Sequence, residues 1–172
     1  MQFTTRTVTN LSLLTAVSIV LTRLFAVAVP IGGHTVLRLS FGEIPIMLAG
    51  VLFGPAAGAV TGAAADLIGY LMNPFGGPFF PGFTVSAALT GLIAGLMLRG
   101  ARSFSWKQMG VMVAVNDLIT SVALNTFWLV QLYGLDPRLI LPTRVGARLV
   151  TIPIYTVVLV LLARLYRKQA LA

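Results

Sequence analysis

RLSFGEIPIMLAGVLFGP, residues 38–55, is the stretch that decides how this chain folds. Its apolar run extends from Ile44 to Phe53 and stops at Gly54-Pro55. At about 1.5 Å per residue, a helix of this length covers about half of a hydrocarbon core about 30 Å thick. Such a helix persists in a membrane where other protein segments cover its ends. The stretch therefore predicts a short helix over 43–53 that turns back at Gly54-Pro55 inside a bundle.

The start of this short helix carries two polar residues and a neighbouring cation. Ser40 and Glu43 have the spacing of a capping box, which predicts that Glu43 caps the helix rather than acting in catalysis. Arg38 lies just before the helix and is a candidate ligand contact.

The composition of the whole chain indicates a polytopic membrane protein. Of its 172 residues, 58% are hydrophobic and 9% are charged, whereas soluble domains carry about 25% charged residues. The chain has no cysteine, which excludes disulfides and thiolate chemistry. Its net charge of +8 could indicate nucleic-acid binding in a soluble protein. In a membrane protein such a charge reports orientation, so we expect no nucleic-acid partner.

Charges and Gly/Pro clusters divide the chain into six apolar blocks. We predict an all-α membrane protein, a compact six-helix transmembrane bundle forming a single integral domain over 1–172. The helices are expected at about 9–29, 43–53, 57–72, 83–99, 109–133 and 144–166. Ala26-Val27-Ala28 imitates a signal-peptide cleavage site, but Arg23 interrupts the apolar segment before it and argues against cleavage.

The cations divide between the two sides of such a bundle. Seven fall on one side, which the positive-inside rule assigns to the cytoplasm together with both termini; they are Arg6, Arg99, Arg102, Lys107, Arg164, Arg167 and Lys168. Five fall at or near the outer side and favour a site for an anion, although one or two could simply extend to lipid headgroups. These five are Arg23, Arg38, Arg138, Arg144 and Arg148.

Aromatic and amide side chains are expected at the same outer side. Residues 73–83 read NPFGGPFFPGF, whose prolines and glycines oppose helix formation and whose four phenylalanines could cover a flat aromatic ligand. An aromatic belt at the membrane interface is the alternative, although such belts prefer Trp and Tyr. Asn125 and Trp128 share one helix face, and Arg144, Arg148 and Tyr155 share another.

The remaining polar and small residues are predicted to hold the helices together. Asp66, Asn116 and Asp117 lie inside helices, where we expect them to pair with polar groups of neighbouring helices. Gly58-x-x-x-Gly62 and Gly91-x-x-x-Gly95 have the spacing that allows close helix packing. The four acids and the single His34 form no evident acid–base pair or metal set, so neither catalysis nor a metal is expected.

The sequence resembles the substrate-binding S components of energy-coupling factor transporters. The stretches that carry the likeness are 38–70, 73–95, LNTFWL at 124–129 and LTRLF at 21–25. Within them, FFPGFT at 79–84 and the Asn-Thr-x-Trp element at 125–128 point to the folate-type branch. The resemblance implies a bundle with cytoplasmic termini whose outer loops close over a vitamin. It implies docking through Ser12-x-x-x-Ala16, where the family usually has Ala-x-x-x-Ala, onto a transmembrane coupling subunit with two ATPases.

The resemblance also implies a function and a set of site residues. The chain is expected to bind folate at high affinity in the bacterial cytoplasmic membrane and to deliver it by reorienting in the bilayer. The chain itself needs no cofactor, since its partners use the ATP. The expected substrate-binding residues are Arg23, His34, Arg38, Phe79, Phe80, Thr84, Asn125, Trp128, Arg144 and Arg148.

Three alternatives remain open at this point. The chain could bind another vitamin, such as riboflavin or thiamin, although cationic thiamin fits poorly beside the outer arginines. It could be a channel or an independent secondary transporter. It could also be an intramembrane enzyme that uses Asp66, Asp117 or His34.

Overall fold

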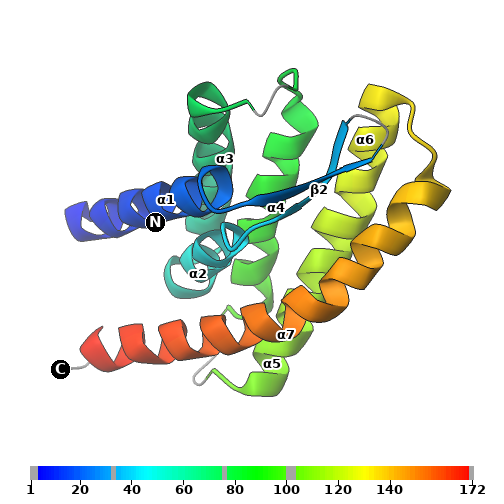
Figure 1. The fold of residues 1–172 in the computed structure, drawn as a ribbon. Helices are drawn as coiled ribbons and strands as arrows, with labels where there is room; N and C mark the ends of the chain where they lie inside the picture. The colour runs from blue at the N-terminus through cyan, green and yellow to red at the C-terminus, as the bar shows by residue number, and fades with distance from the viewer. Residues whose placement is uncertain (1–3, 32–33, 75–76, 100–103, 171–172) are drawn as a thin grey trace.

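The computed structural model describes residues 4–31, 34–74, 77–99 and 104–170, with side chains except at 28–31, 34–39 and 167–170. The described chain folds into a helical bundle that carries one β-hairpin (Figure 1). In chain order the elements are α1 (Thr5–Arg23), β1 (Val27–Ile31), β2 (His34–Leu39), α2 (Glu43–Phe53), α3 (Pro55–Met72), α4 (Pro81–Met97), α5 (Trp106–Asp117), the π-helix η1 (Leu118–Leu124), α6 (Asn125–Tyr133) and α7 (Pro137–Ala170). Since α5, η1 and α6 form one continuous helix, the bundle has the six helices predicted from the sequence.

The lengths of these helices are uneven. Two of them, Trp106–Tyr133 and Pro137–Tyr166, are long and apolar enough to cross a membrane. The start of α1 and the end of α7 lie on the same side of the molecule, at the left of Figure 1. The connection from α3 to α4 and that from α6 to α7 lie toward the top of the same view.

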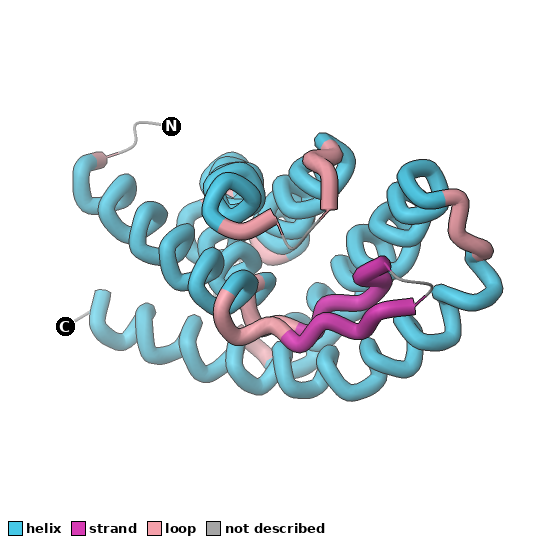
Figure 2. The backbone as a smooth tube through the Cα atoms, turned by 45° about the horizontal axis from the view of Figure 1, so that its top comes forward, coloured by secondary structure: helices cyan, strands magenta, loops and turns pink. Residues whose placement is uncertain are grey.

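The β-hairpin corrects the prediction of a first helix over 9–29. Helix α1 ends at Arg23, and Val27 to Ile31 instead pair with His34 to Leu39 in an antiparallel ribbon. The sequence VAVPI explains this, because Pro30 cannot continue a helix and the β-branched residues favour a strand. Register changes between Val29 and Pro30, where the ribbon has a bulge. The hairpin extends from the end of α1 across the bundle toward α6 and α7 (Figure 2).

Two further boundaries differ from expectation. Helix α7 starts at Pro137 and not at 144, because a proline fits the first helical turn, where no backbone donor is required. Pro142 and Pro153 then lie within this helix. The middle of the predicted helix over 109–133 is a π-helix, for which the apolar pattern gives no signal.

The half-length helix of the opening stretch is present. Helix α2 ends at Gly54, whose φ of 97° lies in the region that favours glycine, and Pro55 begins α3. The predicted cap is wrong: Gly42 occupies the N-cap position without a side-chain cap, and the Ser40 hydroxyl oxygen accepts from the Gly42 amide at 3.4 Å. The Glu43 side chain is therefore available for contacts elsewhere.

A glycine seam joins α2, α3 and α4. A Cβ atom placed on Gly91 would lie 2.0 Å from the carbonyl oxygen of Gly58, and one on Gly58 would lie 2.4 Å from that of Gly91. A Cβ on Gly62 would lie 2.0 Å from the Ala87 carbonyl oxygen. Both predicted small-residue motifs therefore act in packing inside the bundle, as expected.

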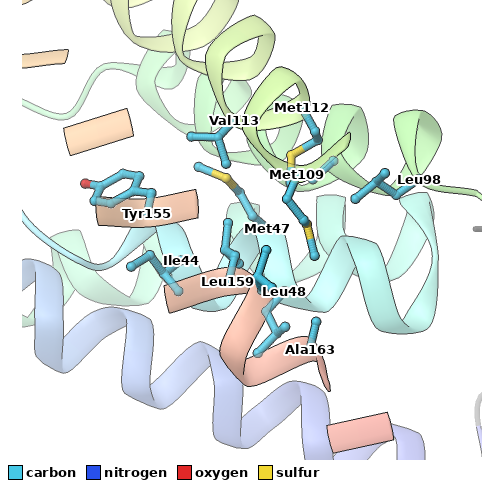
Figure 3. Close-up of a cluster of buried hydrophobic side chains, with 12 residues drawn as sticks. Ile44, Met47, Leu48, Leu98, Met109, Met112, Val113, Tyr155, Leu159 and Ala163 are labelled. Atoms are coloured by element: carbon cyan, nitrogen blue, oxygen red, sulfur yellow. The ribbon is translucent and has the colours of Figure 1, made fainter. Parts of the chain in front are cut away.

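The largest apolar cluster connects this seam to the rest of the molecule. In Figure 3, Met47 and Leu48 of α2 face Met109 and Met112 of α5 and Leu159 of α7. These five side chains are buried. The cluster thus fixes α2 between α5 and α7, which positions the N-terminus of α2 for the polar contacts described next.

Candidate ligand-binding site

A buried ionic cluster lies where α2, η1 and α7 meet. The Nη1 nitrogen of Arg148 lies 3.4 Å from a carboxylate oxygen of Glu43 and 3.4 Å from one of Asp117. The Ser121 hydroxyl donates to both carboxylates, each at 3.4 Å. The side chains of Arg148 and Asp117 are 8% and 1% exposed, so their charges compensate each other away from water.

Two more contacts extend this cluster toward the hairpin. Arg144, one turn before Arg148, donates from Nη1 to the backbone carbonyl of Ser121. The Tyr155 hydroxyl donates to the backbone carbonyl of Ser40, which directly follows β2. Ser40 follows β2, and Glu43 is the first residue of α2. These contacts therefore connect the end of β2 and the start of α2 to α7.

The π-helix shapes this part of the site. η1 extends from Leu118 to Leu124 and contains Ser121, which contacts Arg144 through its carbonyl and the acids through its hydroxyl. π-Helical turns widen the backbone and often occur at functional sites. Immediately after η1, α6 begins at Asn125. The π-helix therefore lies between the ionic cluster and the next candidate binding residues.

A second ion pair connects the end of α1, just before β1, to α3. Arg23, the last residue of α1, lies 3.7 Å from an Asp66 carboxylate oxygen and donates to the Asn73 carbonyl at 2.7 Å. The Thr84 hydroxyl donates to the other Asp66 oxygen at 2.7 Å. The prediction that Asp66 pairs with a neighbouring helix is thereby confirmed. The pair links the ends of α1 and α3 to the start of α4.

An aromatic group lies between α4 and α6. The rings of Phe80 and Trp128 are 5.7 Å apart between centroids, and the Trp128 Nε1–H donates to the Ser86 hydroxyl at 3.1 Å. A Cβ on Gly82 would lie 2.6 Å from the Trp128 ring, so glycine permits this close approach. Phe83 also contacts Phe80, with centroids 5.9 Å apart. The group offers flat apolar faces beside a fixed indole.

Asn125 provides a polar group within one turn of this indole. Its Oδ1 atom is buried and has no hydrogen-bond partner among the described residues. A buried carbonyl oxygen without a donor typically costs about 1–3 kcal/mol, so such an atom in a native protein indicates a missing partner. A ligand with N–H donors on an aromatic edge would satisfy it.

The structure brings together only part of the predicted substrate-binding set. Phe80 contacts Trp128, while Arg144 and Arg148 lie together on α7. Phe79 instead contacts Tyr70, with ring centroids 5.2 Å apart. Arg23 and Thr84 both contact Asp66, as described above.

The structure does not test the predicted roles of four further residues. His34 and Arg38 belong to β2, but their side chains lie outside the described part. Ser12 and Ala16 are exposed on α1. Ligand or partner contacts of all these residues stay predictions.

Sequence reasoning missed the contacts that hold the arginines in place. Glu43 was assigned to a cap, and Ser121 and Ser86 were not singled out. Asp117 was expected to pair, and it does so with Arg148, 31 positions away. The only sequence signal was the scarcity of acids: four acidic residues among twelve cations in an apolar chain need partners.

Over residues 2–168 the sequence matches the family described as ECF-type riboflavin transporter, S component. The folate transporter FolT of Clostridium novyi (strain NT) is 31% identical over 141 residues, covering 82% of this chain and 78% of the relative. FolT of Leuconostoc mesenteroides subsp. mesenteroides is 35% identical over 130 residues, covering 75% of this chain and 66% of the relative.

Two solved structures share the fold. A crystal structure of FolT bound with folic acid has a TM-score of 0.81 and 28% identity, covering 94% of each chain. A structure described as the S component of a bacterial ECF transporter has a TM-score of 0.68 and 25% identity, covering 96% of this chain and 95% of the other.

An apolar helical bundle that pairs its charges and places a buried amide oxygen near aromatic rings indicates a membrane protein with a candidate ligand site. Its curated relatives are transporters and not enzymes. The chain belongs to the S-component family of ECF-type transporters, which confirms the family predicted from the sequence.

Proposed function

We propose that this chain is the high-affinity folate-binding S component of an ECF-type vitamin importer in the bacterial cytoplasmic membrane. The observation that carries the proposal is that both curated relatives are named folate transporters and that the matched FolT structure holds folic acid. The site supports it, since the ligand's heteroaromatic ring carries N–H donors and its glutamate tail carries carboxylates.

The ring of the ligand is assigned to the group around α6. Asn125 Oδ1 accepts from a ring N–H, while Trp128 and Phe80 contact the ring faces. Trp128 is held in place by Ser86, so its indole needs little further ordering when the ligand binds. The carboxylates of the tail are assigned to the arginines, with Arg144 ahead of Arg148, because Arg148 already lies beside two acids.

Transport is assigned to a larger assembly. The exposed Ser12 and Ala16 on α1 allow close approach of a coupling-subunit helix, which small residues favour in membranes. Two ATPase subunits supply the energy, and the S component delivers folate by reorienting in the bilayer. Both termini face the cytoplasm in this arrangement, in accordance with the seven cations near that side.

The test compares the only two tryptophans of the chain. Trp128→Ala should weaken folate binding by about tenfold to a hundredfold, the effect of losing one buried aromatic face. Trp106→Ala is the matched control, because Trp106 is 44% exposed at the far end of the same continuous helix and contacts Arg164. Equal folate affinities of the two variants would contradict the assigned site.

Riboflavin is the second candidate ligand, because the matching family description names it. Equilibrium binding of radiolabelled folate to the purified chain, without ATP, should be displaced by unlabelled folate and not by riboflavin. Riboflavin as the tighter competitor would move the chain to the other vitamin within the same family.

A further inference from the structure

The charged residues of this chain are distributed unevenly between the two ends of the bundle. All four acids, Glu43, Asp66, Asp117 and Asp136, lie at or toward the end of the bundle that carries the hairpin and the connections 73–80 and 134–136, here called the hairpin end. Four arginines with described side chains lie there too, namely Arg23, Arg138, Arg144 and Arg148. The described side chains of the hairpin end thus have balanced charge, and Arg38 of β2, whose side chain lies outside the described part, adds one cation there.

Opposite charges at the hairpin end also lie close to one another. Arg23 lies 3.7 Å from Asp66. Arg148 lies 3.4 Å from both Glu43 and Asp117, and Arg144 joins the same cluster through Ser121.

The fourth arginine also lies beside an acid. Asp136 accepts the backbone amide of Arg138 at 2.8 Å, so opposite charges lie two positions apart in the α6–α7 connection. Every described charge at the hairpin end therefore has an opposite charge nearby.

The surface around the Arg23–Asp66 pair is strongly apolar. Leu24 and Phe25 are 73% and 68% exposed just after Arg23. Leu71 and Met72 are 82% and 70% exposed at the end of α3. In an end that always faces water, such exposure costs free energy in proportion to the apolar area. In contact with hydrocarbon it costs little.

We propose that Asp66 cancels the charge of Arg23 so that this part of the hairpin end can pass into the hydrocarbon when the protein reorients. The inference rests on the proposed function, because reorientation is part of it. A single uncompensated charge in the centre of a bilayer is costly, and a close pair with a hydrogen-bonded carboxylate reduces that cost. Binding of a ligand from water makes no such demand.

The first experiment separates binding from uptake with a charge cycle. Asp66→Asn leaves the Arg23 cation uncompensated and retains an oxygen for the Thr84 hydroxyl. Folate uptake by the complete transporter in proteoliposomes should fall by up to about a hundredfold. Folate binding to the solubilised chain should change by less than about threefold, since Asp66 is not among the residues expected to contact the ligand.

The double variant Arg23→Gln with Asp66→Asn is the decisive control. It removes both charges, so uptake measured at saturating folate should recover to within about tenfold of the wild-type rate, because neither position then carries an uncompensated charge. Uptake that stays as low as in Asp66→Asn would overturn the proposal. So would a parallel loss of binding and uptake in the single variant, since that result assigns the pair a structural role.

A second experiment adds a charge without touching the core. Leu71→Lys places a cation on a side chain that is 82% exposed at the hairpin end. Leu165→Lys does the same on a side chain that is 58% exposed near the end of α7, beside Arg164. Leu71→Lys should slow uptake and spare binding, whereas Leu165→Lys should spare both. Equal uptake by the two variants would overturn the proposal even if Asp66→Asn fails to fold.

These outcomes differ from a failure of the proposed function. If the wild-type chain did not bind folate, or if the complete transporter took up none, the function itself would be wrong. The charge proposal is tested only by the differences among variants that bind as the wild type does.

Discussion

The glycine seam gives a prediction whose magnitude follows from the structure. Gly91→Ala places a methyl carbon 2.0 Å from the Gly58 carbonyl oxygen and 2.2 Å from its carbonyl carbon. Ordinary contacts of such a carbon begin at 3.4 Å. Helices α3 and α4 must therefore separate by roughly 1.4 Å at this point, which is the difference between ordinary contact and the present spacing.

This separation has a large expected cost. A gap of about 1 Å already loses up to about half of the dispersion energy of the atoms that line it. Overpacking of a well-packed core typically costs about 1–3 kcal/mol, and the contacting atoms here are backbone, which cannot rotate away. We expect Gly91→Ala to destabilise the fold by about 3 kcal/mol, or to lower its melting temperature by about 6–12 °C.

The assay is thermal unfolding of the purified chain in detergent, followed by size-exclusion chromatography with fluorescence detection. Gly146→Ala is the matched control, since a Cβ there has no neighbour within 4 Å in the described part of the chain and Gly146 lies within α7. Its better helix propensity should make that variant as stable as wild type or more stable by up to about 1 kcal/mol. If Gly91→Ala melted together with Gly146→Ala, the close-packed seam would be refuted.

Three further predictions concern the site and the docking face. Arg148→Ala leaves the buried Asp117 carboxylate and the partly exposed Glu43 carboxylate without their cation, and it should destabilise the chain by about 3–5 kcal/mol in the same thermal assay, beyond any loss of binding; unchanged stability would contradict the ionic cluster. Asn125→Leu should reduce folate affinity by roughly tenfold with no loss of stability, because the amide oxygen has no partner within the described protein; normal affinity by equilibrium binding would remove Asn125 from the site. Ala16→Trp should leave folate binding intact and abolish uptake by the complete transporter, since a bulky side chain prevents close helix approach; normal uptake would contradict docking at this position.

Much of the fold was predictable because its signals are local. The short apolar run and the Gly54-Pro55 turn defined α2, and the four-residue glycine spacings predicted the seam. These features depend on the few residues around them, so one sequence suffices to read them. The β-hairpin was missed because the residues between Arg23 and VAVPI are all apolar, and apolar residues suit a membrane helix and a strand alike.

The site was less predictable because its contacts join distant segments. Spacing along a helix shows which residues share a face, so Arg144, Arg148 and Tyr155 were grouped correctly. It does not show which residues face them, and Glu43 lies 105 positions before Arg148. The π-helix has a similar cause, since it is stabilised by contacts of Ser121 with other helices rather than by its own residue types.

The helices of the bundle pack against one another in two ways. Helices α2, α3 and α4 approach at backbone distance through glycines, which leaves no room for side chains to rearrange. The start of α2 instead contacts α7 and η1 through the polar side chains of Glu43, Arg148 and Ser121, whose arrangement can change without moving a backbone, while the apolar cluster packs the rest of α2 against α5 and α7. The assigned ring site lies at the border, where Trp128 of α6 donates to Ser86 of α4 and meets Phe80. A ligand bound there would contact closely packed helices on one side and polar side chains that can rearrange on the other. Specificity for its ring is therefore expected to depend on α6, and retention of its charged tail on α7.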